Sequence, residues 1–165
     1  MPIVLVGVPG AGKSTVGQLL AERLDLDFVD TDLVIEQRAG KSISDIFVQD
    51  GEPVFRSLEK QVVADAISNE GCVISVGGGA LMDADTRMLV KTQECVWLQA
   101  GLSQAVDRVG MNKNRPLLLG NVRGQLADLM TAREPLYIEC AKHVVDTNNM
   151  TPDQVVEQIV ETVGK

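Results

Sequence analysis

Aromatic residues are scarce in this sequence, which has three Phe, one Trp and one Tyr among 165 residues. Hydrophobic residues nevertheless make up 45% of the chain, so its core must consist mainly of aliphatic side chains. Aliphatic cores of this kind are typical of parallel strands covered by helices on both faces. The length and apolar content suit one contiguous core, and we expect a single domain over residues 1–165.

Cysteine and histidine are also rare. The sequence has three cysteines, Cys72, Cys95 and Cys140, and one histidine, His143. The cysteines are odd in number and far apart, without a C-x-x-C pair, so neither a disulfide framework nor a zinc site is indicated. We expect three reduced thiols in the core.

Long apolar runs and an excess of basic residues are absent as well. No run approaches the roughly 18 apolar residues that a membrane span needs, and the first residues lack the basic flank of an export signal. The net charge of −8 opposes general attraction to nucleic acid or anionic lipid. We therefore expect a cytoplasmic protein that binds neither nucleic acid nor membranes. No heptad run calls for a partner, so we expect a monomer.

Short aliphatic runs alternate with helical periodicity, which indicates repeated βα units and an α/β fold. Strands are predicted at residues 3–6, 27–30, 72–76, 95–98 and 144–146. Helices are predicted from residue 13, at 31–39, from Ser42 or Ser44 to 47, from 51 to about 68, and at 84–91, 103–109 and 124–141. A last helix should begin at the capping box of residues 151–154. The polar, glycine-flanked segment 110–124 is expected to be a mobile loop.

Residues 7–14 form a phosphate-binding pattern. Their sequence, GVPGAGKS, matches G-x-x-x-x-G-K-[ST] and lies between the first predicted strand and the first predicted helix. Backbone N–H groups and the helix amino end can hold phosphates there. Lys13 would reach the outer phosphates, and the Ser14 hydroxyl would bind Mg²⁺. The pattern predicts a nucleoside triphosphate site but does not name the reaction.

A regulatory GTPase does not fit the rest of the sequence. Residues 112–115, NKNR, resemble the guanine-reading N-K-x-D, but Arg115 replaces the required carboxylate. Residues 107–110, DRVG, fit D-x-x-G but end only two residues before Asn112. This gap is too short for the strand and helix that should separate the two motifs.

Four further features point to the phosphate acceptor. Asp30 and Asp32 close the second predicted strand beside the phosphate loop, where a carboxylate can orient a hydroxyl and take its proton. Capping of the next helix is the alternative reading of this pair. The glycines at 77–79 allow close approach to a ligand. Arg56 and Arg133 suit forked contacts with a carboxylate, although solvated helix arginines remain the alternative.

Taken together, these motifs resemble the shikimate kinase family over nearly the whole chain. The phosphate loop, Asp30-Thr31-Asp32, Phe55-Arg56, the triple glycine, residues 115–118 (RPLL), and Arg133 with Tyr137 occur in the order and spacing of that family. The resemblance implies a five-stranded parallel sheet in the order 2-3-1-4-5 flanked by helices. It also implies phosphorylation of the 3-hydroxyl of shikimate by MgATP.

The resemblance further implies residue roles. Asp32 would hold the reacting hydroxyl and act as base, with Lys13 and Arg115 as the other catalytic residues. Segment 110–124 would be a lid carrying Arg115. The remaining assignments are as follows: ATP binding by Gly10, Ala11, Gly12, Lys13, Ser14, Thr15, Arg108 and Arg115; substrate binding by Asp32, Arg56, Gly78, Gly79 and Arg133; and Mg²⁺ binding by Ser14 and Asp30.

One segment departs from the family pattern. Some members carry an arginine near the adenine, where this chain reads Asn148-Asn149-Met150-Thr151-Pro152. Two other functions fit the sequence less well. A small kinase for gluconate or a nucleoside monophosphate is disfavoured by the arginine pair and the triple glycine. A silent nucleotide-binding module is disfavoured by the joint presence of Asp32, Lys13 and Arg115.

Overall fold

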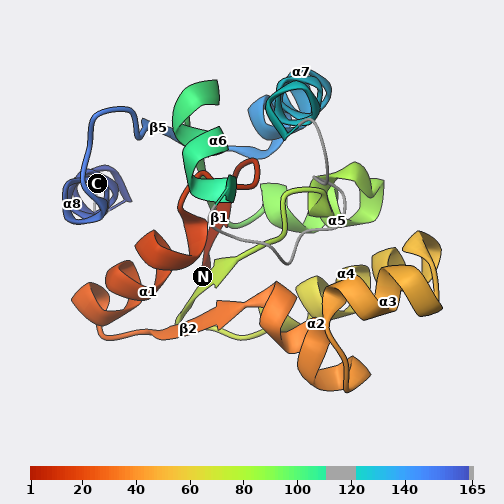
Figure 1. Cartoon of the computed structure of the whole chain (residues 1–165). Coiled ribbons are helices and arrows are strands. Elements are labelled where there is room, and N and C mark those ends of the chain that lie inside the picture. Colours follow the sequence, from red (N-terminus) through yellow and green to blue (C-terminus); the bar gives the residue numbers. More distant parts are fainter. Residues whose placement is uncertain (111–121, 164–165) are drawn as a thin grey trace.

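The chain forms one five-stranded parallel sheet in a computed structural model that describes residues 1–110 and 122–163 (Figure 1). The strand order is β2-β3-β1-β4-β5, as expected. The strands are β1 (Ile3–Val6), β2 (Asp27–Asp30), β3 (Cys72–Ser75), β4 (Glu94–Gln99) and β5 (His143–Asp146). Each predicted strand agrees with the observed one to within one residue at either end.

The three central strands explain why the core is aliphatic. All four residues of β1 and of β3 are buried, as are the four middle residues of β4. Val4 of β1 pairs with Ile74 on one side and Cys95 on the other. Strands buried on both faces favour β-branched side chains, which the sequence supplies.

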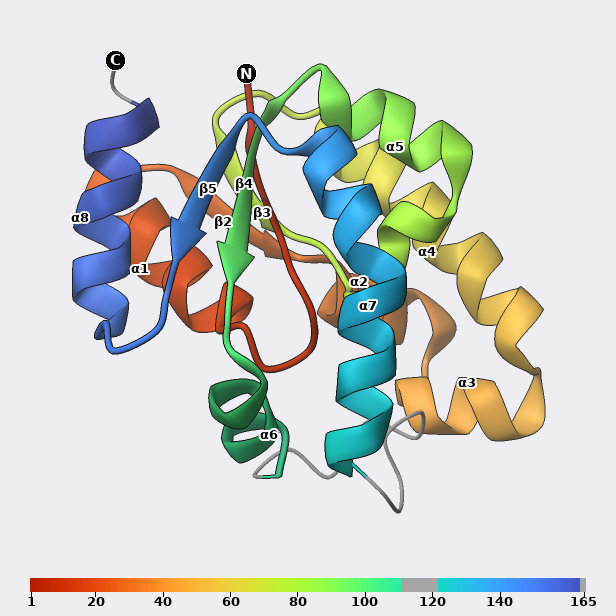
Figure 2. The same ribbon diagram turned by 90° about the horizontal axis from the view of Figure 1, so that it is seen from above.

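Helices cover both faces of the sheet (Figure 2). The helices α1 (Lys13–Leu24) and α8 (Pro152–Val163) pack together on one face. On the other face lie α4 (Glu52–Ile67), α5 (Ala84–Lys91) and α7 (Val122–Cys140). The helix α6 (Leu102–Gly110) follows β4 beyond the carboxyl edge of the sheet and packs on α7. The carboxyl edge therefore carries the phosphate loop and the start of α6.

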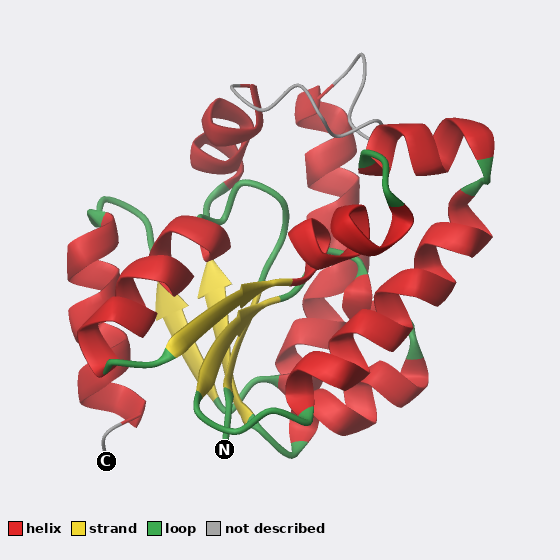
Figure 3. Cartoon of the chain, turned by 90° about the horizontal axis from the view of Figure 1, so that it is seen from below, coloured by secondary structure: helices red, strands yellow, loops and turns green. Residues whose placement is uncertain are grey.

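A second, smaller apolar cluster lies outside the sheet layers. The helices α2 (Thr31–Ala39), α3 (Ile43–Gln49) and α4 pack against one another beside the sheet (Figure 3). Their shared core is Ile35, Ile46, Phe55 and Val62, all buried. The rings of Phe47 and Phe55 lie 4.9 Å apart.

Local capping signals are confirmed. The Ser42 side chain, rather than that of Ser44, accepts a hydrogen bond from Asp45 N and begins α3. Thr151 and Gln154 bond reciprocally at the start of α8, at 3.2 and 2.8 Å.

Two boundaries differ from expectation. Gly110 still belongs to α6, and α7 begins at Val122 instead of 124, because helical bonding extends into both ends of the glycine-flanked segment. The predicted lid otherwise falls on residues 111–121, which lie outside the described residues. The short 3₁₀ helix η1 (Ala80–Met82) after the triple glycine was not predicted.

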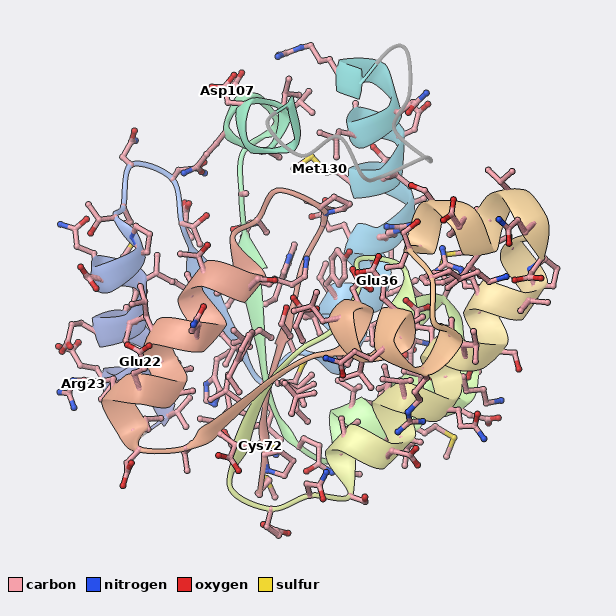
Figure 4. The ribbon with its side chains drawn as sticks, turned by 60° about the horizontal axis from the view of Figure 1, so that its bottom comes forward. Glu22, Arg23, Glu36, Cys72, Asp107 and Met130 are labelled. Atoms are coloured by element: carbon pink, nitrogen blue, oxygen red, sulfur yellow. The ribbon has the colours of Figure 1, made fainter. Side chains whose placement is uncertain are left out.

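The three cysteines are free and buried, as expected. Figure 4 shows Cys72 at the amino edge of the sheet, at the opposite end of the strands from the phosphate loop. Burial raises the pKa of the Cys95 thiol to about 12, so this group stays protonated and unreactive. Among the helices of the described residues, none has both the length and the apolar character to cross a bilayer.

Candidate functional site

The phosphate loop connects β1 to α1 at the carboxyl edge of the sheet. Gly12 adopts φ 91°, a left-handed conformation that glycine tolerates, and α1 begins directly after it. No side chain caps this helix end. Its first N–H groups therefore provide the partial positive charge that phosphates favour.

The Lys13 side chain lies within this loop. It is only 7% exposed, and its ammonium donates to the carbonyl oxygens of Gly7 at 2.8 Å and Val8 at 3.1 Å. These bonds hold the ammonium on the inner side of the loop, in reach of a bound triphosphate chain. The loop is thus folded around the cation that its sequence predicts.

Asp30 serves two purposes at once. Its Oδ1 accepts a hydrogen bond from Asp32 N at 3.0 Å and caps α2, whereas its Oδ2 accepts one from the Ser14 hydroxyl at 2.8 Å. The capping alternative for this residue is therefore correct, but it does not exclude a role at the phosphate loop. The structure brings the two predicted magnesium ligands into direct contact.

The triple glycine lies where charged side chains converge. A Cβ atom at Gly77 would lie 2.8 Å from Glu59 Oε2 and 3.0 Å from Asp32 Oδ1, and one at Gly79 would lie 2.6 Å from Arg56 Nη1. A side chain at Gly77 or Gly79 would therefore displace the charged end of Glu59 or Arg56. Charged groups from α2 and α4 lie directly against this segment.

Gly78 also joins the two halves of the site. A Cβ atom there would lie 2.9 Å from Pro9 Cδ in the phosphate loop and 3.1 Å from Arg133 Nη1. The phosphate loop and Arg133 therefore approach the same glycine. The site predicted for the acceptor is adjacent to the site predicted for the phosphates.

Glu59 is a member of this site that was not predicted. The residue is 3% exposed, and its Oε1 accepts a hydrogen bond from Arg56 Nη1 at 2.8 Å. Burial raises the pKa of Glu59, while the neighbouring Arg56 lowers it. A signal was present in the sequence, because Glu59 lies on the same helical face as Phe55 and Val62, which are buried.

Arg133 is not a solvated helix arginine. Its side chain is 6% exposed, and burial lowers its pKa, with Arg56 acting in the same direction and Tyr137 opposing it. The Tyr137 hydroxyl donates to Gly78 O at 2.9 Å. Two cationic side chains thus lie close enough to influence each other's charge, an arrangement that favours an anionic ligand.

A separate pocket of about 200 Å³ opens beside the phosphate loop. It is lined by Ala11, Thr15 and Val16 on one side and by Thr147, Met150 and Pro152 on the other. This volume is below the roughly 300–1,000 Å³ of pockets that take a whole drug-sized ligand. It suits one ring system of a larger molecule.

Two predicted residues remain to be placed. Arg115 lies outside the described residues. Arg108 belongs to α6, which follows β4 at the carboxyl edge, but its side chain also lies outside the described part of the chain. The structure brings together the other candidates at one edge of the sheet.

The parallel sheet, its phosphate loop and the adjoining charged cluster define a small P-loop kinase. A protein-family model described as "Shikimate kinase" matches residues 9–164. The shikimate kinase of Thermobifida fusca is 48% identical over 158 residues, with 96% of this chain and 92% of that protein covered. The shikimate kinase of Streptomyces coelicolor is 48% identical over 161 residues, covering 98% and 94%.

Solved structures agree with these relatives. The structure of "Shikimate kinase from Acinetobacter baumannii in complex with shikimate" is 37% identical, with a TM-score of 0.96 and coverage of 98% of this chain and 92% of that one. The chain belongs to the shikimate kinase family. Membership of this family makes it a kinase that uses ATP.

Proposed function

We propose that this chain transfers the γ-phosphoryl group of MgATP to the 3-hydroxyl of shikimate. The observation that carries this proposal is the meeting of the phosphate loop and Arg133 at Gly78. Transfer between two substrates requires that donor and acceptor sites adjoin within a few ångströms. Gly10, Ala11, Gly12, Lys13, Ser14 and Thr15 hold the phosphates in this proposal.

The acid is held by two cations. Arg133 and Arg56 grip its carboxylate, and the backbone of Gly78 and Gly79 supplies further contacts. Support comes from the burial of Arg133 and from the close approach of the Arg56 guanidinium to Gly79. A carboxylate bound there would replace water at the partly exposed Arg56 and meet the buried Arg133, and a water-poor site strengthens charge-assisted hydrogen bonds.

Asp32 is the proposed base. Its Oδ1 lies close to Gly77, beside Asp30 and therefore near the phosphate loop. From this place it can accept a hydrogen bond from the acceptor hydroxyl and take its proton as the new P–O bond forms. Glu59 keeps Arg56 oriented without contacting the reacting atoms.

The residues present also fit a magnesium ion. Ser14 and Asp30 offer a hydroxyl and a carboxylate oxygen 2.8 Å apart, the hard oxygen ligands that Mg²⁺ prefers. Mg²⁺ held there would neutralise charge on the phosphates of ATP. The contact between Ser14 and Asp30 supports a shared role of the two residues beside the phosphate loop.

The purine base would occupy the pocket between the phosphate loop and residues 147–152. Thr15 and Val16 line this pocket, and Met150 and Pro152 offer apolar contact for a ring face. Some family members have an arginine in the segment that reads Asn148-Asn149-Met150-Thr151-Pro152 here, and in this chain Met150 offers an apolar contact instead. The resemblance assigns Arg108 to the other face of the base.

The resemblance also assigns a lid to residues 110–124, within one kinase domain spanning 1–165. In this proposal Arg115 stabilises charge on the transferring phosphoryl group, and closure keeps water from the reaction. We further propose a cytoplasmic monomer. Light scattering during size-exclusion chromatography tests the oligomeric state: a mass near 17.8 kDa supports the monomer, and a multiple contradicts it.

A coupled ADP-release assay with MgATP tests the reaction. Shikimate, gluconate and AMP are compared as acceptors at equal concentrations. Turnover that depends on shikimate supports the proposal. Turnover with gluconate or AMP alone would retain the phosphate site but refute the acceptor assignments.

A further inference from the structure

Tyr137 occupies the junction between two separate parts of the proposed acid site. It is 2% exposed and lies on α7, one helical turn after Arg133. Its hydroxyl donates to the carbonyl oxygen of Gly78 at 2.9 Å, across 59 residues of sequence. The hydroxyl therefore connects a helix to the loop that follows β3.

Arg133 approaches the same glycine: its Nη1 would lie 3.1 Å from a Cβ atom at Gly78, the residue whose carbonyl oxygen accepts the Tyr137 hydrogen bond. Burial lowers the pKa of Arg133, and the neighbouring Tyr137 raises it. Residues four apart on a helix lie above one another on one face, which explains the contact. Since the hydroxyl proton is given to Gly78 O, its lone pairs remain for the guanidinium.

The hydrogen bond from Tyr137 fixes the direction of the Gly78 carbonyl group. The Gly78–Gly79 peptide is trans, so its C=O and N–H point to opposite sides. With the Gly78 carbonyl held by Tyr137, the Gly79 N–H must point away from Tyr137. Glycine has no side chain to restrict the rotation of this peptide, and the restraint therefore has to come from elsewhere.

The position of the phenol ring is itself fixed. The ring lies 5.6 Å from Trp97 of β4, with the two planes tilted by 34°. Burial raises the pKa of Tyr137 to about 12, so the hydroxyl keeps its proton near neutral pH and continues to donate to Gly78 O. The ring's place in the core thus determines where its hydroxyl can act.

We propose that Tyr137 is a positioning residue for carboxylate recognition, holding the Arg133 guanidinium and the Gly78–Gly79 peptide in fixed relative orientation. This inference rests on the proposed function, since it assumes that Arg133 and these glycines bind the acid. Tyr137 touches neither the reacting atoms nor the nucleotide. It acts through the groups that grip the carboxylate.

Tyr137→Phe tests the proposal because it removes the hydroxyl and keeps the ring. We expect KM for shikimate to rise about tenfold, with KM for ATP and kcat changed less than twofold. An analogue in which the carboxylate is replaced by CH₂OH should be phosphorylated equally well by the variant and the parent chain. Unchanged KM for shikimate, or an equal rise in KM for both substrates, would overturn the proposal.

Two further variants separate positioning from loss of stability. Ile159→Val, at a fully buried position of α8, is a destabilised control that should leave KM for shikimate unchanged. In the double variant Tyr137→Phe with Arg133→Lys, KM for shikimate should rise by less than the product of the two single effects, because Tyr137 acts partly through Arg133. Additive effects would refute that route. If the parent chain itself gives no shikimate-dependent ADP release, the proposed function fails, whatever the variants do.

Discussion

The nucleotide side and the acceptor side of this molecule are built in different ways. The phosphate loop is formed by consecutive residues on the large sheet core, and its main devices are backbone groups and one helix end. The acceptor side is assembled from side chains of α2, α4 and α7 around the triple glycine, and two of its helices belong to a separate small apolar cluster.

The groups of the two sides are positioned by different parts of the structure. A loop of successive residues needs only the correct glycines and a following helix, which local sequence provides. The acceptor side buries charges that are far apart in sequence, and these are tolerated only because each meets an opposite charge or a hydrogen-bond partner. The acceptor side should therefore respond more strongly to single substitutions.

The largest expected effect concerns proton transfer. Asp32→Asn should lower kcat by about 10²–10⁴ because an amide cannot take the hydroxyl proton, whereas KM for ATP should change little. Steady-state kinetics with both substrates varied gives the two constants. The matched control is Asp27→Asn at the exposed, opposite end of β2, which should leave kcat unchanged. Equal kcat in the two variants would remove Asp32 as the base.

The separateness of the small cluster can be tested next. Ile46→Ala deletes buried methyl groups there and should cost about 2–5 kcal/mol in local or global stability. Hydrogen exchange should accelerate first in α2 and α3, while the sheet amides keep their protection. Ile74→Ala, in the equally buried β3, should instead lower protection throughout. Identical exchange patterns would mean that the two cores unfold as one.

A smaller effect is expected at the ion pair of α4. Glu59→Gln should raise KM for shikimate about tenfold, since the 2.8 Å bond to Arg56 loses its charge. Glu52→Gln is the control, because its bond to Arg56 is 3.4 Å long and its side chain is 49% exposed. Equal KM values in both variants would show that burial of the pair does not matter.

The stability of Glu59→Gln relative to the parent chain should also depend on pH. Burial raises the pKa of Glu59 in the folded state above its ordinary 4.5. The stability that this group contributes is therefore complete below pH 4.5 and is lost as the pH rises through the folded-state pKa. Glutamine does not titrate, so the unfolding free energy of Glu59→Gln relative to the parent should increase across that range. Denaturant titrations at several pH values measure it; a relative decrease would contradict the sign.

The smallest effect is expected at the cap of α8, beside the pocket proposed for the purine base. Thr151→Ala removes the hydroxyl that accepts a hydrogen bond from Gln154 N in the capping box of α8, and it should lower the free energy of unfolding by about 1 kcal/mol. Calorimetry should show a Tm lowered by roughly 2–4 °C for a chain of this size. Thr151→Ser keeps the hydroxyl and should restore most of the loss. A drop as large as that of Ile46→Ala would show that the cap stabilises more than its own helix.

The sequence alone determined the secondary structure, the phosphate loop and most members of the site. Strand and helix positions follow from local apolar periodicity, and the loop from eight consecutive residues. The resemblance to a known family supplied the strand order and the residue roles. Ser14 and Asp30, predicted as partners of one ion, do lie in contact.

Only the tertiary structure decided how the acceptor side is held together. Helical spacing puts Glu59 on the same face as Phe55 and Val62, but its burial depends on what packs over that face. The contact between Tyr137 and Gly78 joins residues 59 positions apart, and the space around the triple glycine is filled by side chains from three helices. Such contacts depend on how whole helices and strands pack together. The periodicity of one segment does not show which residue, distant in sequence, will contact it.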